Sequence, residues 1–253
     1  MVGMVISELP IGSIVRFGRY SMGHLTHTID IDWIKVSDDN EFISEKVLLG
    51  MKFDEVEANW MCNDDYWLSN LRQFMNSDNE NWFMPTHQYD KPTDYIHLDG
   101  GYTIRMSRYK GLLYYFKDSE LSAFERTEFG DYLRLPKATE IMGGFKYFKR
   151  RGARAKPVGA YGCLERKNYH EGMFASYFVS DPRTDGCVTE VNRLGKFSSQ
   201  HPACYSGVRP VCKLKASSEV IKTGENTYEM NLSSATPVKY FEETQSLDWL
   251  LGL

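Results

Sequence analysis

The chain has 253 residues and a mass of 29.2 kDa, which is enough for one large domain or two small ones with a sizeable core. Hydrophobic residues make up 42% and charged residues 25%, the proportions of an ordinary globular protein. The formal net charge of −4 argues against general nucleic-acid binding, and no apolar run approaches the length of a membrane span.

Aromatic residues are abundant, with 16 Tyr, 14 Phe and 5 Trp. Such a composition fits a β-rich core, and it also fits a contact surface built from Tyr and Trp. The five Cys are odd in number and form no C-x-x-C pair, which predicts reduced thiols in a protein folded in cytoplasm. We expect no signal peptide, because the first residues lack a basic segment followed by an apolar run.

The first third of the chain predicts strands. Ile11–Tyr20 indicates a turn, a short β-branched strand and a glycine break. Ile29–Trp33 alternates apolar and acidic residues, as a half-buried strand does. Residues 34–36 continue it with the faces exchanged, which predicts a bulge or twist near Trp33. Glu41–Leu49 is predicted to form another strand.

A short amphipathic helix is predicted over Trp67–Asn76. Asn63–Asp65 supplies residues that can cap it and negative charge at the positive end of its dipole. Four apolar residues share one face of a 3.6-residue period, and we expect this face to be buried. They are Trp67, Leu71, Phe74 and Met75.

The middle of the chain, about residues 84–130, predicts an inserted β-hairpin. Asp99-Gly100-Gly101 precedes an alternating arm, Tyr102–Met106, and Leu112–Phe116 forms an aromatic second arm that we assign to the core rather than to a contact surface. Asp131–Ile141 then predicts a short strand, a proline turn and the start of a helix.

Three further strands are predicted, at Met173–Ser180, Val188–Val191 and Val208–Leu214, with Pro210 at an edge or bulge. Beyond them the chain is polar and ends in the apolar segment Ser246–Leu253. Such a segment can dock on its own body or on a neighbour, and both possibilities are open.

Five stretches, taken in chain order, resemble an uncharacterised bacterial and bacteriophage domain family with a C-type-lectin-like fold. They are Ile11–Tyr20, Ile31–Val36, Trp67–Asn76 with its Ser-x-Leu-Arg-x-Phe-x-Asn core, Leu133–Glu140 and Gly207–Val211. The family is similar in fold to the group of formylglycine-generating sulfatase-modifying proteins and phage tropism determinants. The resemblance implies an α+β domain with a twisted antiparallel sheet, short helices and long irregular loops. We therefore expect a domain over residues 1–215, with the hairpin inserted at about 84–130, and a C-terminal extension or docking tail over 216–253.

In phage members of this fold, the residues before the closing Gly-Val-Arg strand form the ligand face. The resemblance places that face at residues 181–206 here, where charges, amides and Tyr suit contact with a glycan or a protein surface. A solvated loop is the alternative. The predicted ligand-binding residues are Asp181, Arg183, Asp185, Asn192, Arg193, Gln200, His201 and Tyr205.

A basic run is the most polarised feature of the chain, and it interleaves cations with Tyr147 and Phe148. Its composition fits contact with a polyanion or an acidic partner, and it also fits a solvated loop. The residues are Lys146, Lys149, Arg150, Arg151, Arg154 and Lys156.

Enzyme chemistry is not indicated. A sulfatase-modifying enzyme would need a reactive thiol pair, but the residues around Cys204 and Cys212 do not reproduce its pattern, and we expect Cys212 to be buried and inert. The six His are scattered, and no glycine-rich phosphate loop occurs. We predict no catalytic residues, no metal and no cofactor.

The sequence thus favours a non-enzymatic binding or structural protein, which the resemblance implies is a bacteriophage virion component made in the host cytoplasm. Its expected partners are a host surface glycan or other virion proteins, with a possible homo-oligomer, no membrane and no nucleic acid. A bacterial module that binds a surface polymer or a protein, and a thiol- or metal-dependent oxidase, are the alternatives.

Overall fold

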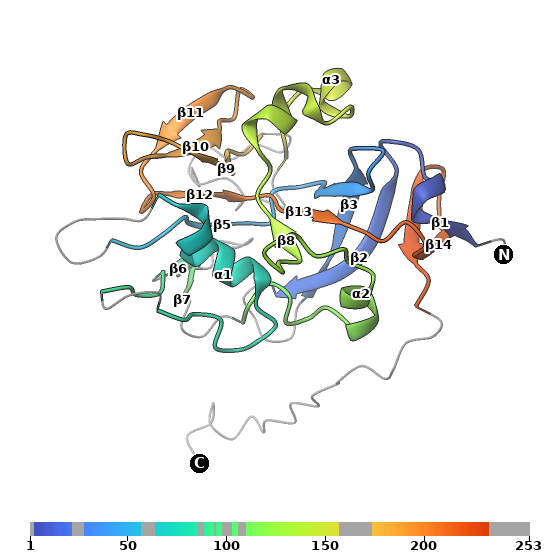
Figure 1. Cartoon of the computed structure of the whole chain (residues 1–253), viewed down its shortest axis with the longest axis horizontal. Coiled ribbons are helices and arrows are strands. Elements are labelled where there is room, and N and C mark those ends of the chain that lie inside the picture. The colour runs from blue at the N-terminus through green and yellow to red at the C-terminus, as the bar shows by residue number, and fades with distance from the viewer. Residues whose placement is uncertain are drawn as a thin grey trace, which may run out of the picture.

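The computed structural model describes residues 3–21, 28–56, 64–85, 89–93, 95–97, 103–105, 110–156 and 174–232. These residues form two mainly antiparallel sheets with a few short helices, so the α+β class is confirmed (Figure 1). Parallel pairing joins β15 (Thr227–Met230) to β2 (Ile14–Ser21), and β12 (Tyr205–Val208) to β9 (Tyr177–Pro182). Within the described ranges, no helix has the length and apolar character needed to cross a membrane.

The first sheet has eight strands among the described residues, and the second has seven. In order, the first comprises β1 (Met4–Val5), β14 (Glu219–Lys222), β15, β2, β3 (Thr28–Lys35), β4 (Glu41–Ser44), β13 (Val211–Lys213) and β8 (Leu133–Arg134). The second comprises β11 (Phe197–Gln200), β10 (Val188–Val191), β9, β12, β5 (Leu49–Lys52), β6 (Tyr95–His97) and β7 (Thr103–Arg105). The helical elements are η1 (Ile6–Glu8), η3 (Tyr66–Leu68), α1 (Asn70–Asn76), α2 (Asp118–Ser122), η6 (Glu140–Gly144) and α3 (Phe148–Arg151).

Two of the passages between the sheets are short and lie next to each other. Residues 45–48 lead from β4 to β5, and Arg209-Pro210 leads from β12 to β13, which follow each other in nearly one line in Figure 1. The crossings are joined by hydrogen bonds, because the Ser44 amide donates to the Pro210 carbonyl at 3.0 Å and Arg209 Nε donates to the Ser44 carbonyl at 3.1 Å. The single strands predicted over 41–49 and 208–214 are therefore wrong: each is two strands in different sheets.

β3 shows why its apolar pattern changes faces. Trp33 is fully buried in one hydrophobic cluster, and Ile34, which is 5% exposed, belongs to a second cluster. The β2–β3 pairing is continuous at Trp33 itself, so the predicted bulge does not lie at that residue. The register shift lies on β2 between Arg16 and Arg19, around Gly18. The two clusters cover opposite faces of the sheet at this end, and the neighbouring residues Trp33 and Ile34 are therefore both apolar.

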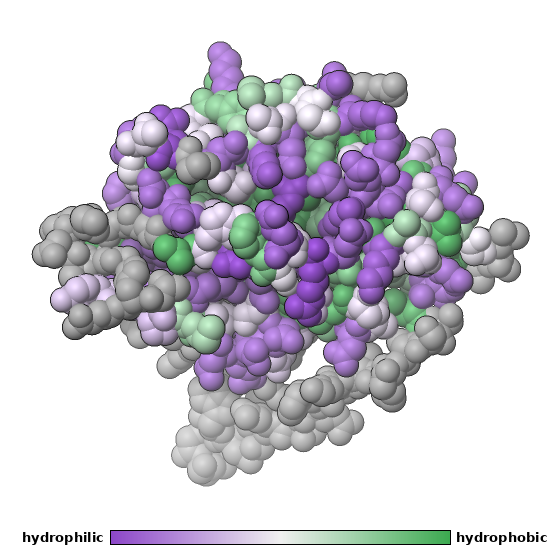
Figure 2. Space-filling model, viewed as in Figure 1, coloured by the Kyte–Doolittle hydropathy of each residue, from purple (hydrophilic) through white to green (hydrophobic). Residues whose placement is uncertain are grey.

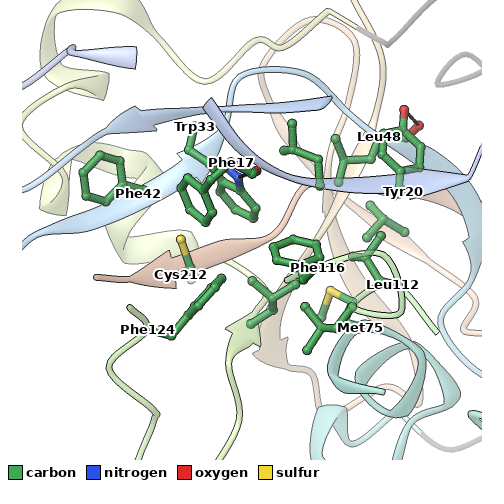
Figure 3. Packing of buried hydrophobic residues seen from close by; sticks show 14 of the residues in the cluster. Phe17, Tyr20, Trp33, Phe42, Leu48, Met75, Leu112, Phe116, Phe124 and Cys212 are labelled. Carbon is green, nitrogen blue, oxygen red and sulfur yellow. Dashed lines mark hydrogen bonds between the residues drawn. The ribbon is translucent and has the colours of Figure 1, made fainter. Parts of the chain in front are cut away.

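The larger hydrophobic cluster is built around stacked aromatic rings (Figure 3). Phe17 and Trp33 stack with ring centroids 5.2 Å apart, and Phe124 meets Phe17 edge-on at 5.6 Å. The Trp33 indole N–H donates to the Phe17 carbonyl at 3.0 Å, so the buried polar atom is satisfied. The predicted aromatic core is thus confirmed in this part of the chain.

The predicted helix is present but shorter. Asp65 caps η3 by accepting from the Trp67 amide at 3.0 Å, and Ser69 caps α1 by accepting from the Arg72 amide at 3.2 Å. The face that follows Ser69 is fully buried, as expected, through Leu71, Phe74 and Met75. Trp67 lies before this cap and is 38% exposed, so its predicted burial is wrong. Its ring packs on Phe129, with centroids 3.8 Å apart.

The hairpin predicted between residues 102–106 and 112–116 is wrong, although another hairpin lies in the same region. β6 and β7 pair antiparallel, whereas residues 112–116 form turns rather than a strand. Leu112, Leu113 and Phe116 are nonetheless buried in the larger cluster, as expected for core residues. The predicted Asp99-Gly100-Gly101 turn lies outside the described residues.

Part of the predicted extension belongs to the first sheet. β14 pairs with β1 (Figure 1), and β15 pairs with both β14 and β2. Residues 219–230 therefore continue the sheet rather than leave it. The apolar segment Ser246–Leu253 lies outside the described residues.

Lys35 is buried on β3 at 2% exposure, and its Nζ donates to the Ile6 carbonyl at 2.9 Å. Burial lowers the pKa of Lys35 against the opposing effect of Asp38. We expect Lys35→Met to raise the free energy of unfolding at pH 7 by about 1 kcal/mol, because it removes a buried charge. Ile6 keeps a donor in the Leu9 amide at 3.3 Å.

The lowered pKa of Lys35 also makes the free energy of unfolding depend on pH. Between the lowered folded-state pKa of Lys35 and the ordinary value of 10.5, the unfolded chain binds more protons, so wild-type stability rises with pH in this window. The advantage of Lys35→Met should therefore shrink as the pH approaches 10.5. Urea unfolding of both proteins from pH 7 to 10 measures this, and a variant less stable than wild type at pH 7 would contradict it.

Candidate functional site

The described surface contains a cleft of about 710 Å³, within the size range of small-ligand sites. Four separate parts of the chain line it: the turn before β2, the strand pair β2–β3, the segment from Lys146 to Lys149, and the turn between β14 and β15. Glu45, at the start of the first crossing between the sheets, completes it. The cleft thus depends on the fold and not on a local motif.

Aliphatic side chains of two paired strands provide its apolar lining. Ile14 of β2 and Ile34 of β3 are register partners, and both line the cleft. Gly12, at φ +94°, turns the chain into β2, and a Cβ there would lie 3.9 Å from the Tyr147 ring. The turn and Tyr147 are therefore close neighbours across the cleft.

Asn226 fixes the β14–β15 turn against the start of β2. Its Nδ2 donates to the Gly12 carbonyl at 2.8 Å, and its Oδ1 accepts from the Ser13 hydroxyl at 3.2 Å. Its carbonyl accepts from the Ile14 amide at 3.0 Å. With these bonds in place, this wall is preorganised rather than loose.

The Lys146–Lys149 wall is anchored from beneath. Phe145 and Phe148 are 2% and 4% exposed in the second cluster, and they hold the residues around them at the surface. Lys146 pairs with the Asp38 carboxylate. Lys149 is exposed, and its ammonium has no partner in the part of the chain that the structure describes.

The cleft therefore carries balanced charge. Glu45 is half-buried, and its carboxylate, like the Lys149 ammonium, has no partner among the described side chains. One open acceptor and one open donor, beside an aliphatic lining, suit a ligand that presents hydroxyl groups and C–H faces together. Such a lining does not select for strong negative charge.

The structure spreads the predicted ligand-binding residues over two ends of one hairpin. Val188 of β10 pairs with Gln200, and Val191 pairs with Phe197. His201 therefore lies toward the β9–β10 turn that carries Asp185, whereas Asn192 and Arg193 lie at the other end. Tyr205 belongs to β12, where Lys52 lies 5.6 Å from its ring centroid.

Several of these residues already have internal partners. Asp181 accepts from the Ala138 amide, and Arg183 pairs with Asp185 at 2.8 Å. The hydrogen bond from Arg183 lowers the pKa of Asp185 to about 2. His201 Nδ1 accepts from the Ala203 amide at 3.2 Å. These side chains hold loops in shape, and the structure does not gather them into one site.

The predicted basic residues likewise lie in different places and do not form one site. Lys146 and Lys149 line the cleft, while Arg154 lies over the Phe174 ring at 4.4 Å. Lys156 is exposed, and its carbonyl accepts from the Val47 amide at 3.0 Å. The side chains of Arg150 and Arg151 lie outside the described part of the structure.

The two cysteines considered for thiol chemistry are both free and differ in exposure. Cys212 is 2% exposed in β13, and burial raises the pKa of its thiol well above the ordinary value. Its predicted burial is confirmed. Cys204 is exposed before β12. Among the described residues, no three His, Cys, Asp or Glu side chains lie close enough to hold one metal ion.

Sequence patterns did not indicate Glu45 or Asn226. Glu45 falls inside a predicted strand, and Asn226 lies 214 positions from the Gly12 carbonyl that it binds. Searches of family models, curated proteins and solved structures each gave no match to this chain.

Proposed function

We propose that the protein is a non-enzymatic binding protein whose rigid two-sheet frame holds a cleft for a carbohydrate. The observation that carries the proposal is the pairing of open polar groups, Glu45 and Lys149, with the aliphatic lining from Ile14 and Ile34. Sugars present hydroxyl groups that both donate and accept hydrogen bonds, around apolar ring faces. A preformed cleft with mixed lining binds them at a low ordering cost.

The setting that we propose follows from the resemblance. A C-type-lectin-like domain from a bacteriophage would use this frame in the virion, and the ligand would be a host surface glycan. Hydrophobic areas are small and scattered on the face in Figure 2, which fits a ligand that is held through polar groups. Contact with another virion protein is the second partner of this proposal, through the exposed Trp67 and Phe129 pair, since exposed aromatic residues are common anchors of protein interfaces.

A glycan-array screen of the full chain tests the proposal. We expect binding to a defined set of glycans, which Glu45→Gln and Lys149→Met should each weaken roughly tenfold or more, because each removes a hydrogen bond from a charged group. Titration calorimetry with the best glycan measures the change.

Matched control substitutions are available on the same chain. Glu128 and Lys137 are exposed and do not line the cleft. Glu128→Gln and Lys137→Met remove the same charges and should leave glycan affinity unchanged. An array without a hit, or equal losses in the cleft and control variants, would contradict carbohydrate binding at this cleft.

A further inference from the structure

The turn between β10 and β11 is held rigidly by one asparagine. Asn192 Oδ1 accepts from the amides of Leu194 and Lys196 at 3.0 and 3.1 Å. The Asn192 amide donates to the Lys196 carbonyl at 2.8 Å, and the Asn192 carbonyl accepts from the Gly195 amide at 2.8 Å. Gly195 has φ +78°, which few other residues adopt. The turn is therefore a fixed platform for its exposed side chains.

A cation from a distant segment packs against this platform. Arg154 Cγ lies 3.0 Å from the position that a Cβ on Gly195 would occupy, and the Arg154 guanidinium lies over the Phe174 ring. Arg154, Arg193 and Lys196 are all exposed. We call these three residues the basic turn. It brings Arg193, from the predicted ligand face, together with Arg154, from the predicted basic run.

We propose that the basic turn binds a linear polymer that carries phosphate groups. Arg154 and Lys196 have no carboxylate partner in the described ranges, so no described carboxylate competes with an incoming anion for either charge. A guanidinium presents a planar fork that matches phosphate oxygens. A site of this kind lies apart from the cleft, and it does not depend on the carbohydrate proposal.

A protein partner fits the basic turn less well. The exposed apolar side chain beside these cations is that of Leu194, which is 75% exposed. Leucine is under-represented among the residues that dominate protein interfaces. The proposed polymer needs only phosphate contacts with the cations. Leu194→Ser should therefore leave polymer binding unchanged.

The test uses the full chain with poly(glycerol phosphate), and with polyglutamate as a carboxylate polymer. Two phosphate contacts, from Arg154 and Lys196, predict that raising the salt from 50 to 200 mM weakens binding roughly 7- to 12-fold. The double variant Arg154→Gln/Lys196→Gln should bind roughly 30-fold more weakly at 50 mM salt. Its binding should then lose most of its dependence on salt.

The control variant Lys137→Gln/Lys222→Gln removes two exposed charges elsewhere and should bind like wild type. Should the first double variant fail to fold, Lys196→Gln alone should still cost roughly fivefold. Equal binding of polyglutamate would assign the site to anionic polymers in general and overturn its phosphate selectivity. Absence of polymer binding, equal losses in the control, or loss of binding in Leu194→Ser would overturn the proposal.

Discussion

Gly18→Ala is expected to lower the free energy of unfolding by about 3 kcal/mol. Gly18 has φ +70°, where an L-residue costs roughly 1–2 kcal/mol. A Cβ at this position would also lie 2.2 Å from the Phe116 ring in the larger hydrophobic cluster. Overpacking of that kind costs roughly 1–3 kcal/mol, because the rings around it cannot move freely. Urea unfolding at neutral pH measures the loss.

Gly130 is the matched control for this substitution. It has φ +81°, but a Cβ there would meet no atom within 4 Å. Gly130→Ala should therefore carry only the backbone cost, about 1 kcal/mol. If both substitutions lower the free energy of unfolding by the same amount, the Phe116 ring does not restrict residue 18 to glycine, which would contradict the prediction.

Arg134→Met is expected to cost about 3 kcal/mol. Arg134 Nη2 lies 2.7 Å from both Glu41 of β4 and Glu140 of η6, and its side chain is 19% exposed. Burial alone would lower the pKa of Arg134, but Glu140 and Glu41 together outweigh it and raise the pKa. Removing the guanidinium leaves two partly buried carboxylates without their cation, which is the costly way to break such a network.

An exposed ion pair provides the comparison. Arg183 and Asp185 lie 2.8 Å apart, with side chains 37% and 47% exposed. Arg183→Met should leave the free energy of unfolding unchanged within error, because solvent screens such pairs. Chemical denaturation of both variants separates the two cases. An Arg134→Met protein as stable as wild type would mean that the Glu41–Arg134–Glu140 network does not hold η6 to the first sheet.

Local signals predicted the elements that depend on local chemistry. The alternation in Ile29–Trp33 identified β3, and the buried face of α1 followed from the period of Leu71, Phe74 and Met75. The predicted helix began too early, because two residues that can cap a helix, Asp65 and Ser69, lie close together. Asp65 caps the short η3, and Ser69 caps α1, so Trp67 remains outside the helix and outside the core.

The crossings and the cleft could not be predicted in the same way. A strand that changes sheets has the same apolar pattern as one that continues, and only the strand pairing distinguishes them. β4 pairs with β3 and β13, whereas β5 pairs with β12 and β6. The cleft joins Gly12, Tyr147 and Asn226, which meet only in the folded chain. The basic run predicted Lys146 and Lys149 as contact residues, but their neighbours in the cleft depend on the order of the strands in the sheet.

Amide hydrogen exchange of the full chain, with and without the best glycan of the array, tests the central proposal most directly. Binding in the cleft should slow exchange at residues 12–14, at 146–149 and around Asn226. Exchange in the β9–β11 strands should stay unchanged. Slowed exchange confined to the β9–β10 turn, or to Trp67 and Phe129, would place the ligand elsewhere and contradict the proposed cleft.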